Sequence, residues 1–236
     1  MEVCVDSLSS AIAAAEGGAT RIELCSALLE DGLTPSVGLF EVVKSVIKIP
    51  IFVMIRPKML NIYNYSEKEV EEMEYDIKMF KSKKADGFVL GALTSEGLVD
   101  ENVCKRLLLI TAPLPVTFHR AFDLTTDPFY SMEKIISLGF ERILTSGQKK
   151  TALEGVNLIT ELIKHSNGRI IIMPGVGICV KNLKVILEKT GAIEFHASAK
   201  TQVILKTPNL GEETKVFVTS KVHVKEMVDI YQNYST

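Results

Sequence analysis

The sequence lacks long apolar runs and a strong net charge, and each absence removes a class of protein. No apolar run in the 236 residues approaches the ~20 residues that a membrane-spanning helix requires. We therefore expect no membrane partner. Lys and Arg number 27 against 29 Asp and Glu, and they are spread along the chain. A DNA-binding surface is typically a basic stripe, so we expect no nucleic-acid partner. Tryptophan is also absent, which by itself excludes nothing.

Cysteine is sparse as well. Its four copies, Cys4, Cys25, Cys104 and Cys179, are scattered, and a chain of this size does not need a disulfide framework. We expect reduced thiols in a cytoplasmic protein. The first apolar run begins within a few residues of Met1, so we expect no signal peptide. No linker or change of composition divides the chain, which predicts one domain over residues 1–236.

Eight short apolar runs divide the chain almost evenly, and a helix-like stretch follows each of them. The runs are residues 2–5, 21–25, 51–55, 87–90, 115–119, 141–144, 169–173 and 193–197. Strands that alternate with helices pair in parallel, because each helix returns the chain to the same end of the sheet. Eight such units predict a single (β/α)8 TIM barrel, whose site would lie at the C-terminal ends of the strands.

Local signals place the helix starts and the long connections. Asp6 is the expected N-cap of the first helix. Ser66 and Glu69 form a capping box, and Pro128 suits the first turn of a later helix. Three connections on the site side are too long for simple turns, and we expect them to be irregular, functional loops. They are residues 26–35, 56–65 and 197–219.

Alternation along the strands separates an apolar set from a polar set. The apolar set should face the helices and the polar set the barrel interior. The expected interior charges, with Arg56 just beyond its strand, are Glu2, Glu23, Arg56, His119, Glu194 and His196. Such groups are costly to bury unless they pair or bind something. Two interpretations stay open: a structural ion-pair network, or a polar site for a metal or a small ligand. Asp123 is expected to pair with Arg120 or to orient His119.

Cys4 and Cys25 belong to the same inward set on neighbouring strands, and we expect them near the same height. Neighbouring strands are ~4.8 Å apart, so two thiolates could share one soft ion such as Cu(I) or Zn(II). His119 or His196 would add an imidazole. The alternative is that both cysteines merely fill space, as buried cysteines often do. Cys104 and Cys179 are interpreted as packing residues.

Two glycine-containing segments, Thr145–Gly147 and Met173–Ile178, follow the sixth and seventh runs. Barrels often bind phosphate near such ends. Glycine also simply makes tight turns, so both interpretations stay open.

Several segments carry a family resemblance. They are residues 1–7, 17–26, 32–36, 53–57, 115–123, 142–147 and 194–196, with Val116-Thr-Phe-His-Arg-Ala-Phe-Asp123 the most specific. The chain resembles the copper homeostasis protein CutC family. The resemblance implies a TIM barrel, a cytoplasmic and also nuclear location, a homo-oligomer and a role in handling copper. It carries the family's metal-ligand proposal onto Cys4 and Cys25.

The chain departs from the family pattern around the barrel mouth. Lys58-Met-Leu-Asn-Ile62 stands where the family usually has Arg-Gly-Gly-Asp-Phe, and the segment 201–219 lacks the usual Gly- and Ser-rich character. Ala197 replaces a commoner cysteine or serine. These changes indicate a partly altered mouth.

Three functions follow from these observations. The first is a copper homeostasis protein that binds Cu(I) through Cys4 and Cys25. The second is an enzyme acting on a small polar or phosphorylated metabolite at the barrel mouth, with the catalytic candidates Glu23, Arg56, His119 and His196. A barrel retained for assembly and partner binding is the third.

Overall fold

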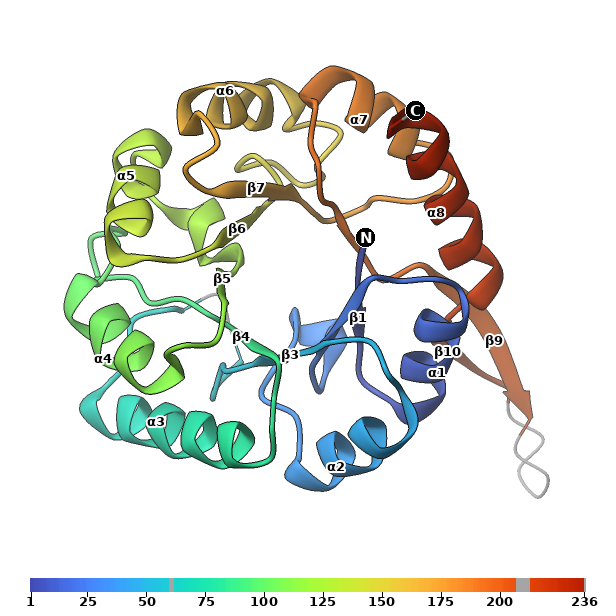
Figure 1. Ribbon diagram of the computed structural model, residues 1–236, viewed down its shortest axis with the longest axis horizontal. Coiled ribbons are helices and arrows are strands. Elements are labelled where there is room, and N and C mark those ends of the chain that lie inside the picture. The colour runs from blue at the N-terminus through green and yellow to red at the C-terminus, as the bar shows by residue number, and fades with distance from the viewer. Residues whose placement is uncertain (60–61, 207–212, 236) are drawn as a thin grey trace.

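The strands form a ring of parallel β-structure around a central axis (Figure 1). The structure is a computed structural model that describes residues 1–59, 62–206 and 213–235. Its eight-stranded sheet has the order β7-β6-β5-β4-β3-β2-β1-β8. The strands are β1 (Glu2–Val5), β2 (Arg21–Leu24), β3 (Ile51–Met54), β4 (Gly87–Leu90), β5 (Val116–Phe118), β6 (Arg142–Thr145), β7 (Ile171–Pro174) and β8 (His196–Ala197). The predicted (β/α)8 barrel is confirmed.

The helices form an outer ring around the strands (Figure 1). They are α1 (Leu8–Glu16), α2 (Val37–Val46), α3 (Glu67–Ser82), α4 (Glu101–Thr111), α5 (Pro128–Leu138), α6 (Val156–Ser166), α7 (Leu183–Thr190) and α8 (Lys221–Ser235). The capping box of Ser66 and Glu69 is present. The expected N-cap at Asp6 is wrong: Ser7 accepts the hydrogen bond from the Ser10 amide instead. None of the described helices has the length and apolar character needed to cross a membrane.

Two separate apolar clusters confirm the predicted alternation. The larger one lies between strands and helices and contains the outward residues Val3, Val5 and Ile22. The smaller one contains the inward residues Cys25, Phe52, Met54 and Val89. Ile193 departs from the pattern, because β8 begins only at His196 and Ile193 is 65% exposed. The polar set therefore enters the barrel where the strands are regular.

The connection after β8 contains two further strands where irregular loop was expected. β9 (Lys200–Lys206) pairs antiparallel with β10 (Glu213–Thr219), and this hairpin projects from the barrel beside α1 and α8 (Figure 1). The Thr219 amide donates to Ser10 Oγ at 3.2 Å, which anchors the hairpin base to α1. Its β-branched residues favour strands. Of the altered segment 58–62, residues 60 and 61 lie outside the described residues.

Candidate metal centre

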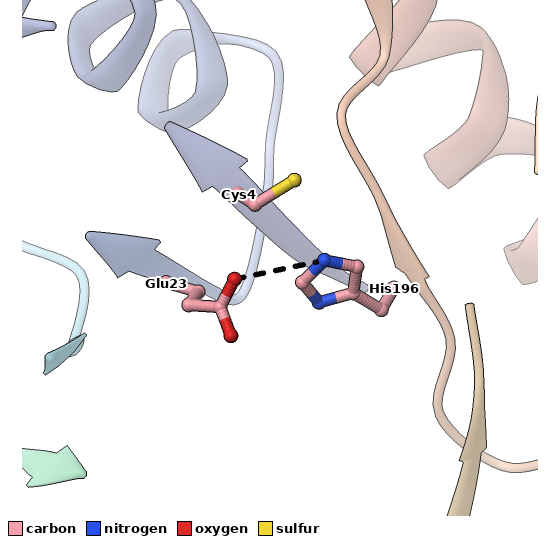
Figure 2. A group of neighbouring side chains, drawn as sticks. All are labelled: Cys4, Glu23 and His196. Atoms are coloured by element: carbon pink, nitrogen blue, oxygen red, sulfur yellow. Dashed lines mark ion pairs between the residues drawn. The ribbon is translucent and has the colours of Figure 1, made fainter. Parts of the chain in front are cut away.

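Three side chains from three neighbouring strands meet inside the barrel. The register pairs Cys4 with Glu23 between β1 and β2, and Glu2 with His196 between β1 and β8. Figure 2 shows Cys4, Glu23 and His196 directed toward one another. One potential ligand atom from each of the three lies within 4.8 Å of the others, and all three residues are buried. The arrangement offers a metal ion one sulfur, one oxygen and one nitrogen donor.

Cys25 does not lie at the height expected from the sequence. Cys4 is opposite Glu23, so Cys25 is two residues further toward the C-terminal end of the barrel. Its thiol donates to Glu23 Oε2 with a separation of 3.4 Å, and its side chain packs in the inner apolar cluster. Alternation along a strand shows which residues point inward, but it does not show which residue of the next strand lies opposite. The pairing of β1 with β2 therefore places Cys4 and Cys25 at different heights. Cys25 thus adjoins the cluster through Glu23.

The orientation of His196 is set by Glu2. Its Nδ1 lies 2.7 Å from Glu2 Oε1, while its Nε2 lies 3.8 Å from Glu23 Oε2. Burial by itself lowers the pKa of His196, but Cys4 and Glu23 outweigh it and raise this pKa well above its usual value. These two neighbours therefore stabilise the protonated ring of His196.

The pKa values of Glu23 and Cys25 are raised as well. Burial raises the pKa of the Glu23 carboxyl, and its Oε1 has no hydrogen-bond partner among the described residues. Burial raises the pKa of the Cys25 thiol well above its usual value, and the neighbouring Glu23 adds to the effect. A cation bound here would replace protons, since ligand atoms must be deprotonated to coordinate.

The lower part of the interior is an ion-pair network. Arg21 Nε lies 2.5 Å from Glu2 Oε2, and Arg21 Nη2 lies 2.5 Å from Glu194 Oε2. Arg142 Nε also reaches Glu194, at 2.8 Å. Burial alone raises the pKa of Glu2, yet Arg21 and the hydrogen bond from His196 lower it to about 2. Glu2 and Glu194 therefore belong to a structural ion-pair network, the first of the two interpretations of the interior charges. Arg21 and Arg142 were not among the interior charges predicted from the sequence, although both occupy inward positions of the same alternation.

A cavity of about 930 Å³ opens above the cluster at the C-terminal ends of the strands. Cys4, Glu23 and His196 line it, as do Arg56 and His119. Cys25 is fully buried and lies outside its wall. The accessible sulfur of the cluster is therefore Cys4, which is 9% exposed.

Comparison with known proteins places the chain in a family. The CutC family model matches residues 1–201. The chain belongs to the CutC family. It is 55% identical over 201 residues to the copper homeostasis protein cutC homolog of Mus musculus, covering 85% of this chain and 74% of that protein. A CutC family protein of Xanthomonas axonopodis pv. citri is 41% identical over 239 residues and matches 98% of both chains.

A solved structure supports the same assignment. The CutC structure from Streptococcus agalactiae superimposes with a TM-score of 0.79 at 33% identity, covering 84% of this chain and 97% of that one. The chain is thus a member of a copper homeostasis family with the TIM-barrel fold. The model match ends one residue after β9 begins, so β10 and α8 lie beyond it.

His119 presents an unused donor in this CutC protein. The Ala121 amide donates to His119 Nδ1 at 3.3 Å, so the neutral ring carries its proton on Nε2. Burial, with Arg56 nearby, lowers the pKa of His119 to about 3, which keeps the ring neutral. His119 Nε2 has no hydrogen-bond partner among the described residues. The ring lines the cavity and packs on Tyr63, with 4.9 Å between ring centroids.

Arg56 supports the loop after β2. Its Nη1 donates to the carbonyl oxygens of Glu30, at 2.6 Å, and Gly32, at 2.8 Å. These bonds fix the segment that follows Cys25. Of the four catalytic candidates, Glu23 and His196 belong to the group that could hold a metal ion, while His119 and Arg56 form other parts of the cavity wall.

The carboxylate of Asp123 accepts hydrogen bonds from the loop after β6. It accepts from the Ser146 amide at 3.0 Å and the Gln148 amide at 3.2 Å. It also accepts from Arg120 Nε at 3.3 Å, which confirms the expected pair with Arg120. In the Thr145–Gly147 segment, which was a phosphate candidate, the Ser146 amide is therefore engaged by Asp123, and the Gly147 amide donates to Thr145 Oγ1 at 2.9 Å.

Proposed function

We propose that this CutC family protein binds Cu(I) as cargo in the cluster at the bottom of the barrel cavity. The observation that carries the proposal is the meeting of Cys4, Glu23 and His196, whose ligand atoms lie within 4.8 Å of one another. Cys25 extends the set through its contact with Glu23. Both cysteines of the sequence-based hypothesis thus adjoin one buried polar group.

The donor chemistry fits Cu(I) better than a hard cation. Thiolate sulfur selects Cu(I) and Zn(II), and imidazole accepts both, whereas Mg²⁺ and Ca²⁺ require oxygen ligands. The cluster holds two sulfurs and one imidazole around a single carboxylate. Free oxygen capacity remains at Glu23 Oε1. A bound cation would also compensate the buried carboxylate, which lacks a full set of partners.

The two cysteines have different parts in this proposal. Cys4 lines the cavity and would meet the incoming ion first. Cys25 lies in the apolar inner cluster, where burial disfavours its thiolate until a cation is present. Cu(I) would enter at Cys4 and be retained by Cys25 and His196.

Anaerobic Cu(I) titration against a coloured Cu(I) chelator tests the proposal. We expect tight stoichiometric binding by the wild type and its loss in the Cys4→Ser/Cys25→Ser double variant. The affinity should fall by more than the roughly 100-fold caused by losing a contact that only supports a ligand. Cys179→Ser is the matched control, because Cys179 is exposed and lies outside the cluster.

Two results would count against the proposal. Stoichiometric binding that survives in the double variant would exclude the cysteines as ligands. An equal loss in Cys179→Ser would indicate non-specific capture by exposed thiol. Circular dichroism of each variant establishes that the barrel is folded during the titration.

A further inference from the structure

The loop after β7 contains a run of backbone donors in residues that line the same cavity. Val176, Gly177 and Ile178 all line it. Their N–H groups donate to no acceptor within the described parts of the chain. The flanking amides are satisfied: Gly175 donates to Thr145 O at 2.9 Å, and Cys179 donates to Asn182 Oδ1 at 2.8 Å. Three consecutive donors are therefore available between two anchored ends.

The backbone of this loop is strained at the residues that carry these amides. Val176 has φ +75° and Gly177 has φ +70°. Positive φ is a genuine outlier for a β-branched residue, and such strain costs on the order of 1–3 kcal/mol. Two hydrogen bonds hold the turn: the Ala152 amide donates to Val176 O at 3.0 Å, and Asn182 Nδ2 donates to Gly177 O at 2.8 Å. The carbonyls are anchored and the N–H groups are left open.

The neighbouring loop shows which kind of acceptor such amides bind. After β6, the amides of Ser146 and Gln148 bind the carboxylate of Asp123. The loop after β7 has no comparable carboxylate from the described chain. The amides of the loop after β6 thus bind a carboxylate of the protein itself. In the described residues, the amides of the adjacent loop after β7 bind none.

The charge of the cavity lining favours an anion. Lys181, Lys200 and Lys215 line the cavity, and none of the three pairs with a carboxylate in the described residues. Five basic and three acidic side chains line the cavity, although acidic residues outnumber basic ones in the chain as a whole. The cavity is thus locally positive in a slightly acidic protein.

His119 supplies a second, independent donor in the same cavity. It is 2% exposed, and its Nε2 lacks a hydrogen-bond partner among the described residues. A buried polar group without a partner costs about 1–3 kcal/mol. A ligand atom that accepts from Nε2 would remove that cost. The cavity volume of about 930 Å³ lies within the ~300–1,000 Å³ range of small-molecule sites.

We propose that the loop of residues 176–178 binds the phosphate group of a small phosphate monoester, whose organic part extends across the cavity to His119. Open backbone N–H groups with nearby positive charge are the usual phosphate donors in proteins. The site lies above the thiol cluster and uses different residues. The cavity would then contain two binding sites, one for the phosphate monoester and one for Cu(I).

Backbone amide NMR tests this assignment directly in the full-length, copper-free protein. Glycerol 3-phosphate is titrated at constant ionic strength, with glycerol and acetate as parallel probes. We expect saturable shifts in the amides of Val176, Gly177 and Ile178 with glycerol 3-phosphate. The amides of Ser146 and Gln148, held by Asp123, should remain unchanged and serve as an internal control.

A pair of lysine variants sharpens the test. Lys181→Gln should weaken glycerol 3-phosphate binding roughly two- to fivefold, the effect of one exposed ion pair. Lys184→Gln is the matched control, because Lys184 lies three residues further on, pairs with Glu188 and does not line the cavity. Absence of shifts in residues 176–178, or equal shifts with acetate or glycerol, would overturn the assignment. Since copper is absent, neither result depends on the Cu(I) proposal.

Discussion

His196 Nδ1 lies 2.7 Å from Glu2 Oε1, a contact between residues 194 positions apart in the sequence. It joins β1 to β8, the strands that carry the two ends of the barrel sequence. Glu2 uses its other oxygen to bind Arg21. One carboxylate therefore links the ion-pair network at the base of the barrel to the cluster above it.

The first prediction concerns this contact. Glu2→Gln should weaken Cu(I) binding by about 10-fold, because the ring of His196 loses the charged acceptor that orients it. The measurement is the same anaerobic chelator competition. Glu16→Gln is the control, since Glu16 is an exposed partner of Lys221. Unchanged affinity in Glu2→Gln would show that His196 is not a ligand or does not need Glu2.

Arg21 should be important for stability. Arg21→Met removes the guanidinium that Glu2 and Glu194 share, so that among the described residues Glu2 keeps only His196 and Glu194 keeps only Arg142. Breaking a buried ion pair typically costs about 3–5 kcal/mol. We expect a loss of that size in the free energy of unfolding from urea denaturation. Arg169→Met removes an exposed pair with Glu133 and should leave the midpoint nearly unchanged. Similar midpoints for the two variants would contradict the structural importance of the network.

The buried, neutral His119 should make the fold sensitive to acid. Burial lowers its pKa from 6.5 to about 3. Between these two pH values, His119 is protonated in the unfolded chain and neutral in the folded chain. The associated stability is present above the unfolded pKa of 6.5 and is lost as the pH falls toward 3. Between pH 7 and pH 5 the wild type should lose about 2 kcal/mol more than His119→Gln.

Urea denaturation of both proteins at several pH values measures that difference. Parallel curves for wild type and His119→Gln would show that His119 protonates normally in the folded state. The opposite sign applies to His196, whose pKa is raised: its contribution is present at low pH and is lost as the pH rises through its folded value. The contributions of His119 and His196 to stability can thus be distinguished, because they change in opposite directions with pH.

Asp123→Ala should free the loop after β6. The variant removes the acceptor of the Ser146 and Gln148 amides, and loss of hydrogen bonds to a charged group costs about 1.5–3 kcal/mol each. We expect lower stability, together with new phosphate-induced shifts at Ser146 and Gln148. Asp127→Ala provides a comparison, because Asp127 caps α5 through the Phe129 amide without contacting this loop. No response to phosphate at Ser146 and Gln148 would refute the equivalence of the two loops.

Much of the fold could be predicted because its signals are local. Alternation of apolar and polar residues has a period of two in any strand, so the inward positions of Cys4, Glu23 and His196 follow from the sequence. The capping box at Ser66 depends only on residues three positions apart. The hairpin was missed, although Val203, Val216 and Val218 favour strands, because its pairing partner is another segment of the same long connection.

The sequence by itself determined which side chains enter the barrel, since strand geometry alone assigns alternate residues to opposite faces. Only the tertiary structure decided how high each of them lies. The stagger between strands is set by hydrogen bonding around the ring, and it places Cys4 opposite Glu23 rather than Cys25. The same holds for the two loops. Packing between distant segments places Asp123 against one of them, whereas the amides of residues 176–178 in the other, which lines the cavity, have no acceptor in the described parts of the chain.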